Sequence, residues 1–288
     1  MDTQELIKKV RRIEIKTKGL SNHIFSGEYH TAFKGRGMSF SEVRAYQYGD
    51  DVRSIDWNVT ARLDEPHVKV FEEERELTMM LMVDISRSAF FGSTEAFKNQ
   101  IITEVSAVLS FSAVQNNDKV GIIFFSDKVE KFIPPKKGKS HILRIIRELI
   151  ETKPESKGTN ISEALQFFNN IQKKRSIVFL LSDFFDKDFQ DPLKLVKKKH
   201  DLVAMQIYDP MEEQLPNIGL VNAFDAETGQ YKWLDTSSKK VRESHRQWFE
   251  EKRAHTKAVM MRAGVDFISL RSDESYVNAL LKFFKKRI

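Results

Sequence analysis

The sequence predicts an α/β fold: a doubly wound, mostly parallel sheet preceded by an irregular β-rich amino-terminal extension. From residue 78 onward, apolar runs of strand length alternate with amphipathic helical segments. The runs are continuous, as in strands covered on both faces. The segment before residue 78 lacks this alternation and is rich in Arg, Asp and Glu. We therefore expect two regions, residues 1–77 and residues 78–288.

The elements follow from composition and period. Strands are expected at 77–84, 119–127, 129–135, 175–183, 201–209 and 265–272. Helices are expected at 4–16, 95–115, 141–150, 161–171, 192–199, 238–263 and 275–284. The prolines in 129–135 suit an edge strand, and Gly264 suits the end of a helix. Residues 221–235 are expected to form a β-hairpin turning at 227–229.

In the block from residue 40 to 62, single apolar residues are separated by many charged residues. Its charged side chains are Arg44, Asp50, Asp51, Arg53, Asp56 and Arg62. Two interpretations compete: a network of ion pairs that docks this lobe on the main domain, or a recognition surface for a partner. We favour docking, with Tyr46 and Trp57 as the anchors.

The composition limits the class of protein to which this chain can belong. The 288 residues are 41% hydrophobic, enough for a core, and include no cysteine, which excludes disulfides and thiolate metal sites. We find no apolar stretch long enough to span a bilayer and no apolar signal-peptide core near the start, so a soluble cytoplasmic protein is expected. The net charge of +6 is modest and its basic runs suit solvated faces, so nucleic acid is not an expected partner.

Three polar clusters follow predicted strands or open a predicted helix, at one edge of the sheet. Their candidate ligands are Asp84, Ser86, Ser88, Thr159 and Asp183. Each cluster alone has an ordinary explanation in turns and helix caps; Asn160 with Glu163, for example, matches a capping box. Together, carboxylates and hydroxyls predict a hard oxygen site for a divalent cation, Mg²⁺ first and Mn²⁺ or Ca²⁺ as alternatives. The two carboxylates are expected to act through waters and the three hydroxyls directly.

These motifs resemble two known patterns. DISRS, GTN and SD, in this order, resemble the metal-ion-dependent adhesion site of von Willebrand factor A domains, over about residues 78 to 288. The block FSEVRAYQYGDDVRSIDWNVTARLDEPHVKVFEEERE resembles the signature of the DUF58 family. The resemblance implies a von Willebrand factor A-like fold of the Rossmann type. One departure is Ala89, where many relatives have Met.

The resemblance also implies a function. DUF58 proteins are often encoded beside MoxR-type AAA ATPases and are suspected of assisting them in protein maturation or metal insertion. We therefore expect a non-enzymatic interaction module whose protein partner donates an Asp or Glu to the cation. The alternatives are a metal-dependent hydrolase and a nucleic-acid-binding module. The sequence has no Gly-x-Ser-x-Gly elbow and no P-loop to favour an enzyme.

Overall fold

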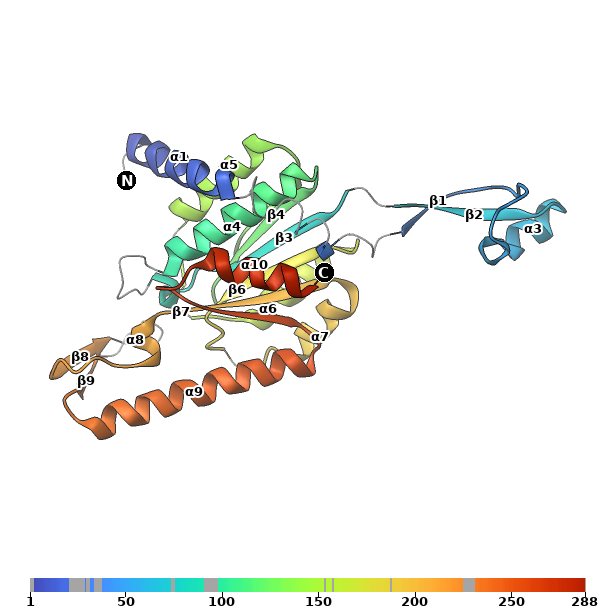
Figure 1. The fold of residues 1–288 in the computed structure, drawn as a ribbon. Helices are drawn as coiled ribbons and strands as arrows, with labels where there is room; N and C mark the ends of the chain where they lie inside the picture. The colour runs from blue at the N-terminus through green and yellow to red at the C-terminus, as the bar shows by residue number, and fades with distance from the viewer. Residues whose placement is uncertain are drawn as a thin grey trace.

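The computed structural model gives the arrangement of most of the chain (Figure 1). It describes residues 3–20, 29, 32–33, 38–73, 76–90, 98–152, 154–156, 158–186, 188–224 and 231–287. The helices are α1 (Thr3–Leu20), α3 (Trp57–Leu63), α4 (Lys98–Gln115), α5 (Lys139–Glu151), α6 (Ile161–Ile171), α7 (Gln190–Lys199), α8 (Pro210–Glu213), α9 (Lys239–Arg262) and α10 (Tyr276–Arg287), with short 3-10 turns η2 (Val52–Ser54) and η3 (Arg87–Phe90). The strands are β1 (Met38–Ala45), β2 (His67–Glu73), β3 (Thr78–Asp84), β4 (Lys119–Phe125), β5 (Val129–Lys136), β6 (Ile177–Ser182), β7 (Asp201–Tyr208), β8 (Leu220–Phe224), β9 (Tyr231–Asp235) and β10 (Asp266–Arg271).

The central sheet confirms the predicted fold class. Among the described residues it has six strands in the order β10-β7-β6-β3-β4-β5. The pairs β3–β4, β3–β6, β6–β7 and β7–β10 are parallel, and the proline-containing β5 is an antiparallel edge strand as predicted. If β3, β4, β5, β6, β7 and β10 are numbered 1 to 6 and the sheet is read from the β5 edge, the strand order is 3-2-1-4-5-6. This is the order of doubly wound folds.

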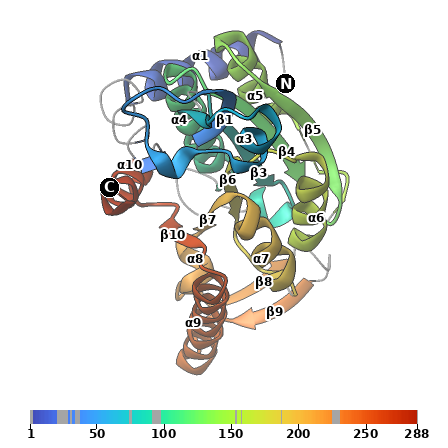
Figure 2. The same ribbon diagram turned by 90° about the vertical axis from the view of Figure 1, so that its right-hand side faces the viewer.

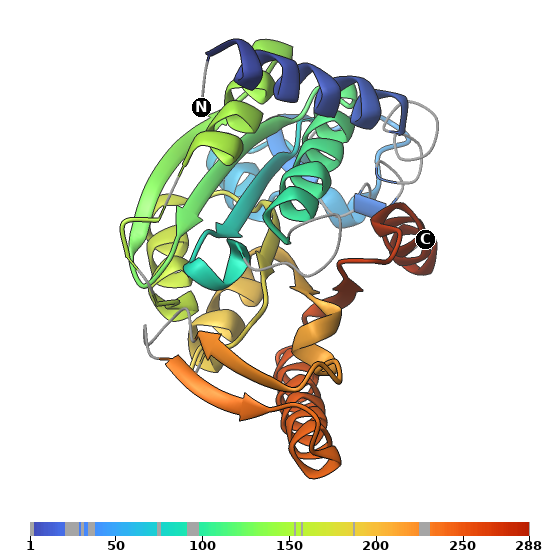
Figure 3. The same cartoon turned by 90° about the vertical axis from the view of Figure 1, so that its left-hand side faces the viewer.

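Helices cover both faces of the sheet, as the continuous apolar runs predict. In β3, Met79, Leu81 and Val83 pack in one core cluster with residues of α4, α5 and α10. The alternate residues Met80 and Met82 pack in a second cluster with residues of α6, α7 and α9. Because successive side chains of a strand point to opposite faces, one apolar run serves both layers. Figure 3 shows the two layers from the carboxyl edge of the sheet.

Most predicted helices are confirmed, with shifted ends. Gly264 has a φ of 65°, and the Val265 N–H donates to the Met260 carbonyl at 2.9 Å, so α9 ends in the predicted left-handed cap. The start predicted for α4, at 95–97, lies outside the described residues. The hairpin β8–β9 is confirmed, but its turn at 227–229 also lies outside them.

The region before residue 78 differs from expectation in two ways. The antiparallel pair β1–β2 carries a helix, α3, where only short strands were expected. Figure 1 shows β1, β2 and α3 projecting from the side of the sheet where β3 begins. Trp57 is 68% exposed, so the interpretation that it anchors this lobe to the main domain is wrong. Within residues 38–73, which we call the arm, the Arg44 guanidinium pairs with the Asp50 carboxylate at 2.7 and 2.8 Å.

Helix α1, unlike β1, β2 and α3, packs against the central sheet domain. Val10 and Ile13 pack against the core cluster on the α4 side, and the Lys16 ammonium lies 2.6 Å from the Glu104 carboxylate. The division of the chain between residues 77 and 78 remains a prediction. Among the described residues, no helix is long and apolar enough to cross a membrane.

His200 makes the stability of the fold depend on pH. Its ring is 2% exposed and packs against Phe168 at 4.7 Å between centroids, and neither ring nitrogen has a hydrogen-bond partner among the described residues. Burial, helped by the nearby charges of Lys199 and Arg175, lowers the pKa of His200 to about 4. The unfolded chain, in which the pKa is about 6.5, then binds more protons than the folded chain between these values.

We therefore expect the free energy of unfolding to decrease as the pH falls from about 6.5 to about 4. His200 accounts for at most about 3 kcal/mol of this decrease. The His200→Leu variant should lose this part of the slope. Urea denaturation of both proteins across the pH range measures it. Parallel slopes for the variant and the wild type would contradict the assignment.

Candidate metal site

Polar residues stand at the ends of neighbouring parallel strands, at the carboxyl edge of the sheet. Asp84 ends β3, Ser182 ends β6, and Ser126 directly follows β4. The chain after β3 leads to α4 on one face, and the chain after β6 leads to α7 on the other. The space between β3 and β6 is therefore the topological switch point, where doubly wound sheets bind ligands.

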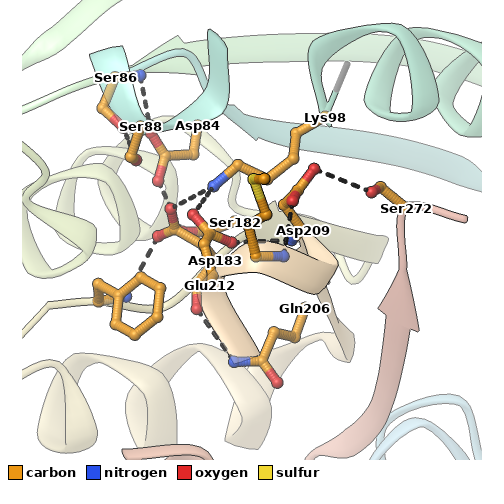
Figure 4. A network of polar contacts seen from close by, with 12 residues as sticks. Asp84, Ser86, Ser88, Lys98, Ser182, Asp183, Gln206, Asp209, Glu212 and Ser272 are labelled. Atoms are coloured by element: carbon orange, nitrogen blue, oxygen red, sulfur yellow. Dashed lines mark hydrogen bonds and ion pairs between the residues drawn. The ribbon is translucent and has the colours of Figure 1, made fainter. Parts of the chain in front are cut away.

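The loop after β3 brings three predicted ligands together (Figure 4). Asp84 is 2% exposed, and one carboxylate oxygen accepts from the Ser86 N–H at 2.9 Å. The other oxygen accepts from the Ser182 hydroxyl at 2.6 Å. The Ser86 and Ser88 hydroxyl oxygens lie 2.9 Å apart. This loop therefore presents two adjacent hydroxyls above a carboxylate whose two oxygens are both engaged.

The charge of Asp84 is poorly compensated. Burial, and after it the nearby Asp183 carboxylate, raises the pKa of Asp84 to about 7, although hydrogen bonds from Ser182 and Ser86 act in the opposite direction. A buried pair of carboxylates is costly unless a positive charge lies close by. A divalent cation at this edge would remove that cost.

Thr159 stands in the loop that opens α6. The Asn160 N–H donates to the Ser126 carbonyl at 2.7 Å, which ties this loop to the end of β4. The Asn160 side chain accepts from the Glu163 N–H at 2.9 Å, so Asn160 caps α6 as predicted. The Thr159 hydroxyl is buried and has no hydrogen-bond partner among the described residues. Because buried polar atoms usually have a partner, this hydroxyl is available to a ligand at this edge of the sheet.

Asp183 is held by a buried lysine that the sequence analysis missed. Its carboxylate accepts from the Phe185 N–H at 3.2 Å and lies 3.2 Å from the Lys98 ammonium. Lys98 is 1% exposed and also contacts Glu212 at 2.6 Å (Figure 4). Burial lowers the pKa of Lys98, but the two carboxylates more than offset this and the net pKa is raised. The ammonium therefore stays charged inside the protein.

Neither Lys98 nor Glu212 has a distinctive sequence signal. Lys98 is an isolated lysine at the start of an apolar helix, and Glu212 belongs to a capping box with Asp209 at the start of α8. The capping box accounts for Glu212 without any site. Only the fold brings residues 98, 183 and 212 together.

The residues fit a cation that is bound mainly by hydroxyls. Among the described residues, no group of three His, Cys, Asp or Glu side chains could hold a metal ion. Direct contact of the Ser86, Ser88 and Thr159 hydroxyls with a cation, with Asp84 and Asp183 acting through waters, remains a prediction. A divalent ion held in this way would keep a coordination position for an outside carboxylate.

The fold and the candidate site define a doubly wound α/β protein with a polar cluster at its switch point and a projecting amino-terminal arm. The chain belongs to the family described as Protein of unknown function DUF58, whose model matches residues 42–255. This confirms the family predicted from the Arg/Asp-rich signature.

Relatives and solved structures are similar at low identity. Uncharacterized protein Rv1480 of Mycobacterium tuberculosis is 26% identical over 291 residues, covering 100% of this chain and 91% of that protein. Uncharacterized protein YeaD of Bacillus subtilis is 28% identical over 109 residues, covering 38% of this chain and 25% of that protein. The crystal structure of conserved hypothetical protein BatB from Bacteroides thetaiotaomicron has a TM-score of 0.48 and 16% identity, covering 73% of this chain and 98% of that one. The SpRpn10 VWA domain has a TM-score of 0.39 and 12% identity, covering 72% and 93%.

Proposed function

We propose that this protein is a non-enzymatic interaction module that binds a divalent cation, Mg²⁺ first, and through it an Asp or Glu of a protein partner. The observation that carries the proposal is the buried Thr159 hydroxyl without a partner among the described residues, in a loop tied to the end of β4, the strand that pairs with β3 and its terminal Asp84. A cation there would pair the hydroxyl and compensate the carboxylates in one step.

The charge balance supports an acidic partner. The Lys98 ammonium contacts Asp183 and Glu212, so these two carboxylates are already partly neutralised within the protein. A divalent ion between hydroxyls remains undercompensated, and an incoming carboxylate both neutralises it and displaces water. The partner class that the family resemblance implies is a MoxR-type AAA ATPase, assisted in protein maturation or metal insertion.

The geometry gives little support to an enzyme. Asp84 is 2% exposed and both of its carboxylate oxygens already accept a hydrogen bond, which disfavours attack on a substrate. The Ser86 hydroxyl pairs with Ser88, and no histidine is bonded to either hydroxyl in the described part of the chain. Activation of a serine nucleophile ordinarily requires such a base.

We expect the Asp84→Ala variant to lose partner binding. Immobilised wild type should capture its partner from a native lysate with Mg²⁺, and capture should drop at least about tenfold with a chelator or with the variant, since the bridge contributes more than about 1.4 kcal/mol. Asp191→Ala is the matched control, because Asp191 is an exposed carboxylate on α7. Circular dichroism checks that each variant is folded. Equal capture by wild type and Asp84→Ala would refute metal-bridged binding.

A further inference from the structure

The arm formed by residues 38–73 has almost no core of its own. Between residues 42 and 70, Val68 is the one residue that is fully buried. An isolated two-stranded ribbon is at best marginally stable in water. The arm nevertheless projects from the body, with its strands pointing away from the sheet (Figures 1 and 2). Such an element gains stability when another surface covers it.

The outer part of the arm exposes large apolar side chains. Tyr48 is fully exposed, Trp57 is 68% exposed, and Val52 and Leu63 are 61% and 58% exposed. These four residues lie in the turn after β1, in η2 and at the two ends of α3. Aromatic side chains exposed on a protruding element are typical of protein interfaces.

The charge of the arm identifies the kind of surface that covers it. Residues 38–73 contain eight acidic and four basic side chains, a net charge of −4, in a chain whose total is +6. The rest of the chain therefore carries +10. Helix α9 alone has eight basic and three acidic residues, a net charge of +5. The chain thus carries both an acidic arm and a basic helix.

Helix α9 offers a complementary surface. Of its 24 residues only Phe249, Thr256, Val259 and Met260 are buried, while Trp248 is 47% and Met261 is 70% exposed. At about 1.5 Å per residue it is roughly 36 Å long, against roughly 26 Å for a strand of eight residues, so the arm can lie along it. Figure 1 shows the arm pointing away from the α9 of its own chain.

We propose that the arm docks on α9 of a second copy of this chain, with Trp57 and its apolar neighbours covered and the acidic side chains facing the lysines and arginines of α9. This interface is separate from the candidate metal site and does not require a cation. Since the charges involved are exposed, salt should weaken the association.

Charge reversal tests the proposal in the full-length protein. Analytical ultracentrifugation at low salt should show self-association of the wild type, weakened at least about tenfold in Asp64→Lys/Glu65→Lys, where two exposed arm acids are reversed, and equally in Lys252→Glu/Lys257→Glu on α9. The reversal Lys285→Glu/Lys286→Glu on α10 is the control and should leave association unchanged. Trp57→Ser should weaken association without a change in charge.

A mixture of the two charge-reversed variants tests whether the arm pairs with α9. The arm-reversed and α9-reversed chains should associate with each other better than either does with itself. In the mixed pair the reversed arm meets the reversed α9 and the unchanged arm meets the unchanged α9, so both contacts are complementary. A monomeric wild type at about 100 μM, or self-association unaffected by the arm and α9 variants, would overturn the proposal. A wild type that stays monomeric but binds a basic foreign protein through Trp57 would overturn it as well.

Discussion

The Lys98→Met variant is expected to be less stable than the wild type without metal and to respond more strongly to Mg²⁺. The Lys98 ammonium is 1% exposed and contacts Asp183 and Glu212. Methionine has a similar length but no charge, so the buried Asp183 carboxylate and the partly buried Glu212 carboxylate lose their partner, at a cost of about 3–5 kcal/mol. A divalent cation near Asp183 replaces the missing charge and meets no competing ammonium.

Scanning calorimetry with a chelator and with millimolar Mg²⁺ measures both effects. In the chelator, the melting temperature of Lys98→Met should fall by roughly 10 °C, and Mg²⁺ should recover a large part of the loss. The control Lys128→Met removes an exposed ion pair with Glu155 and should change little. A Mg²⁺ response no larger than that of the wild type would show that Lys98 does not share its carboxylates with a cation.

The Thr159→Val variant is expected to raise stability without metal. Valine has the shape of threonine without the hydroxyl, and this hydroxyl is buried and unpaired among the described residues. An unsatisfied buried polar group costs about 1–3 kcal/mol, so its removal should raise the melting temperature by a few degrees in a chelator. Most core substitutions lower stability, which makes the sign informative.

The same variant should lose the stabilisation that Mg²⁺ gives the wild type. Ser162→Ala is a suitable control, since the Ser162 hydroxyl lies in the first turn of α6 and already donates to the Asp188 carbonyl at 2.9 Å. A lower melting temperature for Thr159→Val in the chelator would mean that the hydroxyl already has a partner.

The main domain could be predicted because its signals are local. The run Met79 to Val83 and the amphipathic period of 161–171 each fix an element, and an alternation of such elements leaves few folds. The place of the candidate site could be predicted from polar clusters at strand ends, since parallel strands share one carboxyl edge.

The structure of the arm and the burial of Lys98 beside Asp183 could not be predicted in this way. Helix α3 has seven residues, too short for a helical period, and its cap Asp56 precedes the strand-favouring Trp57 and Val59. The exposure of Trp57 depends on where the arm points, which composition does not encode. The contact between Lys98 and Asp183 joins residues 85 positions apart. The unpaired state of Thr159 likewise appears only when its surroundings are known.

Isothermal titration of Mg²⁺ into chelator-treated wild type and Thr159→Val tests the central claim, a cation held by hydroxyls at the switch point. The account predicts one site in the wild type with a Kd of roughly 1 mM or tighter, and binding at least about tenfold weaker in the variant. No heat of binding in the wild type at millimolar Mg²⁺, or equal binding by both proteins, would contradict it.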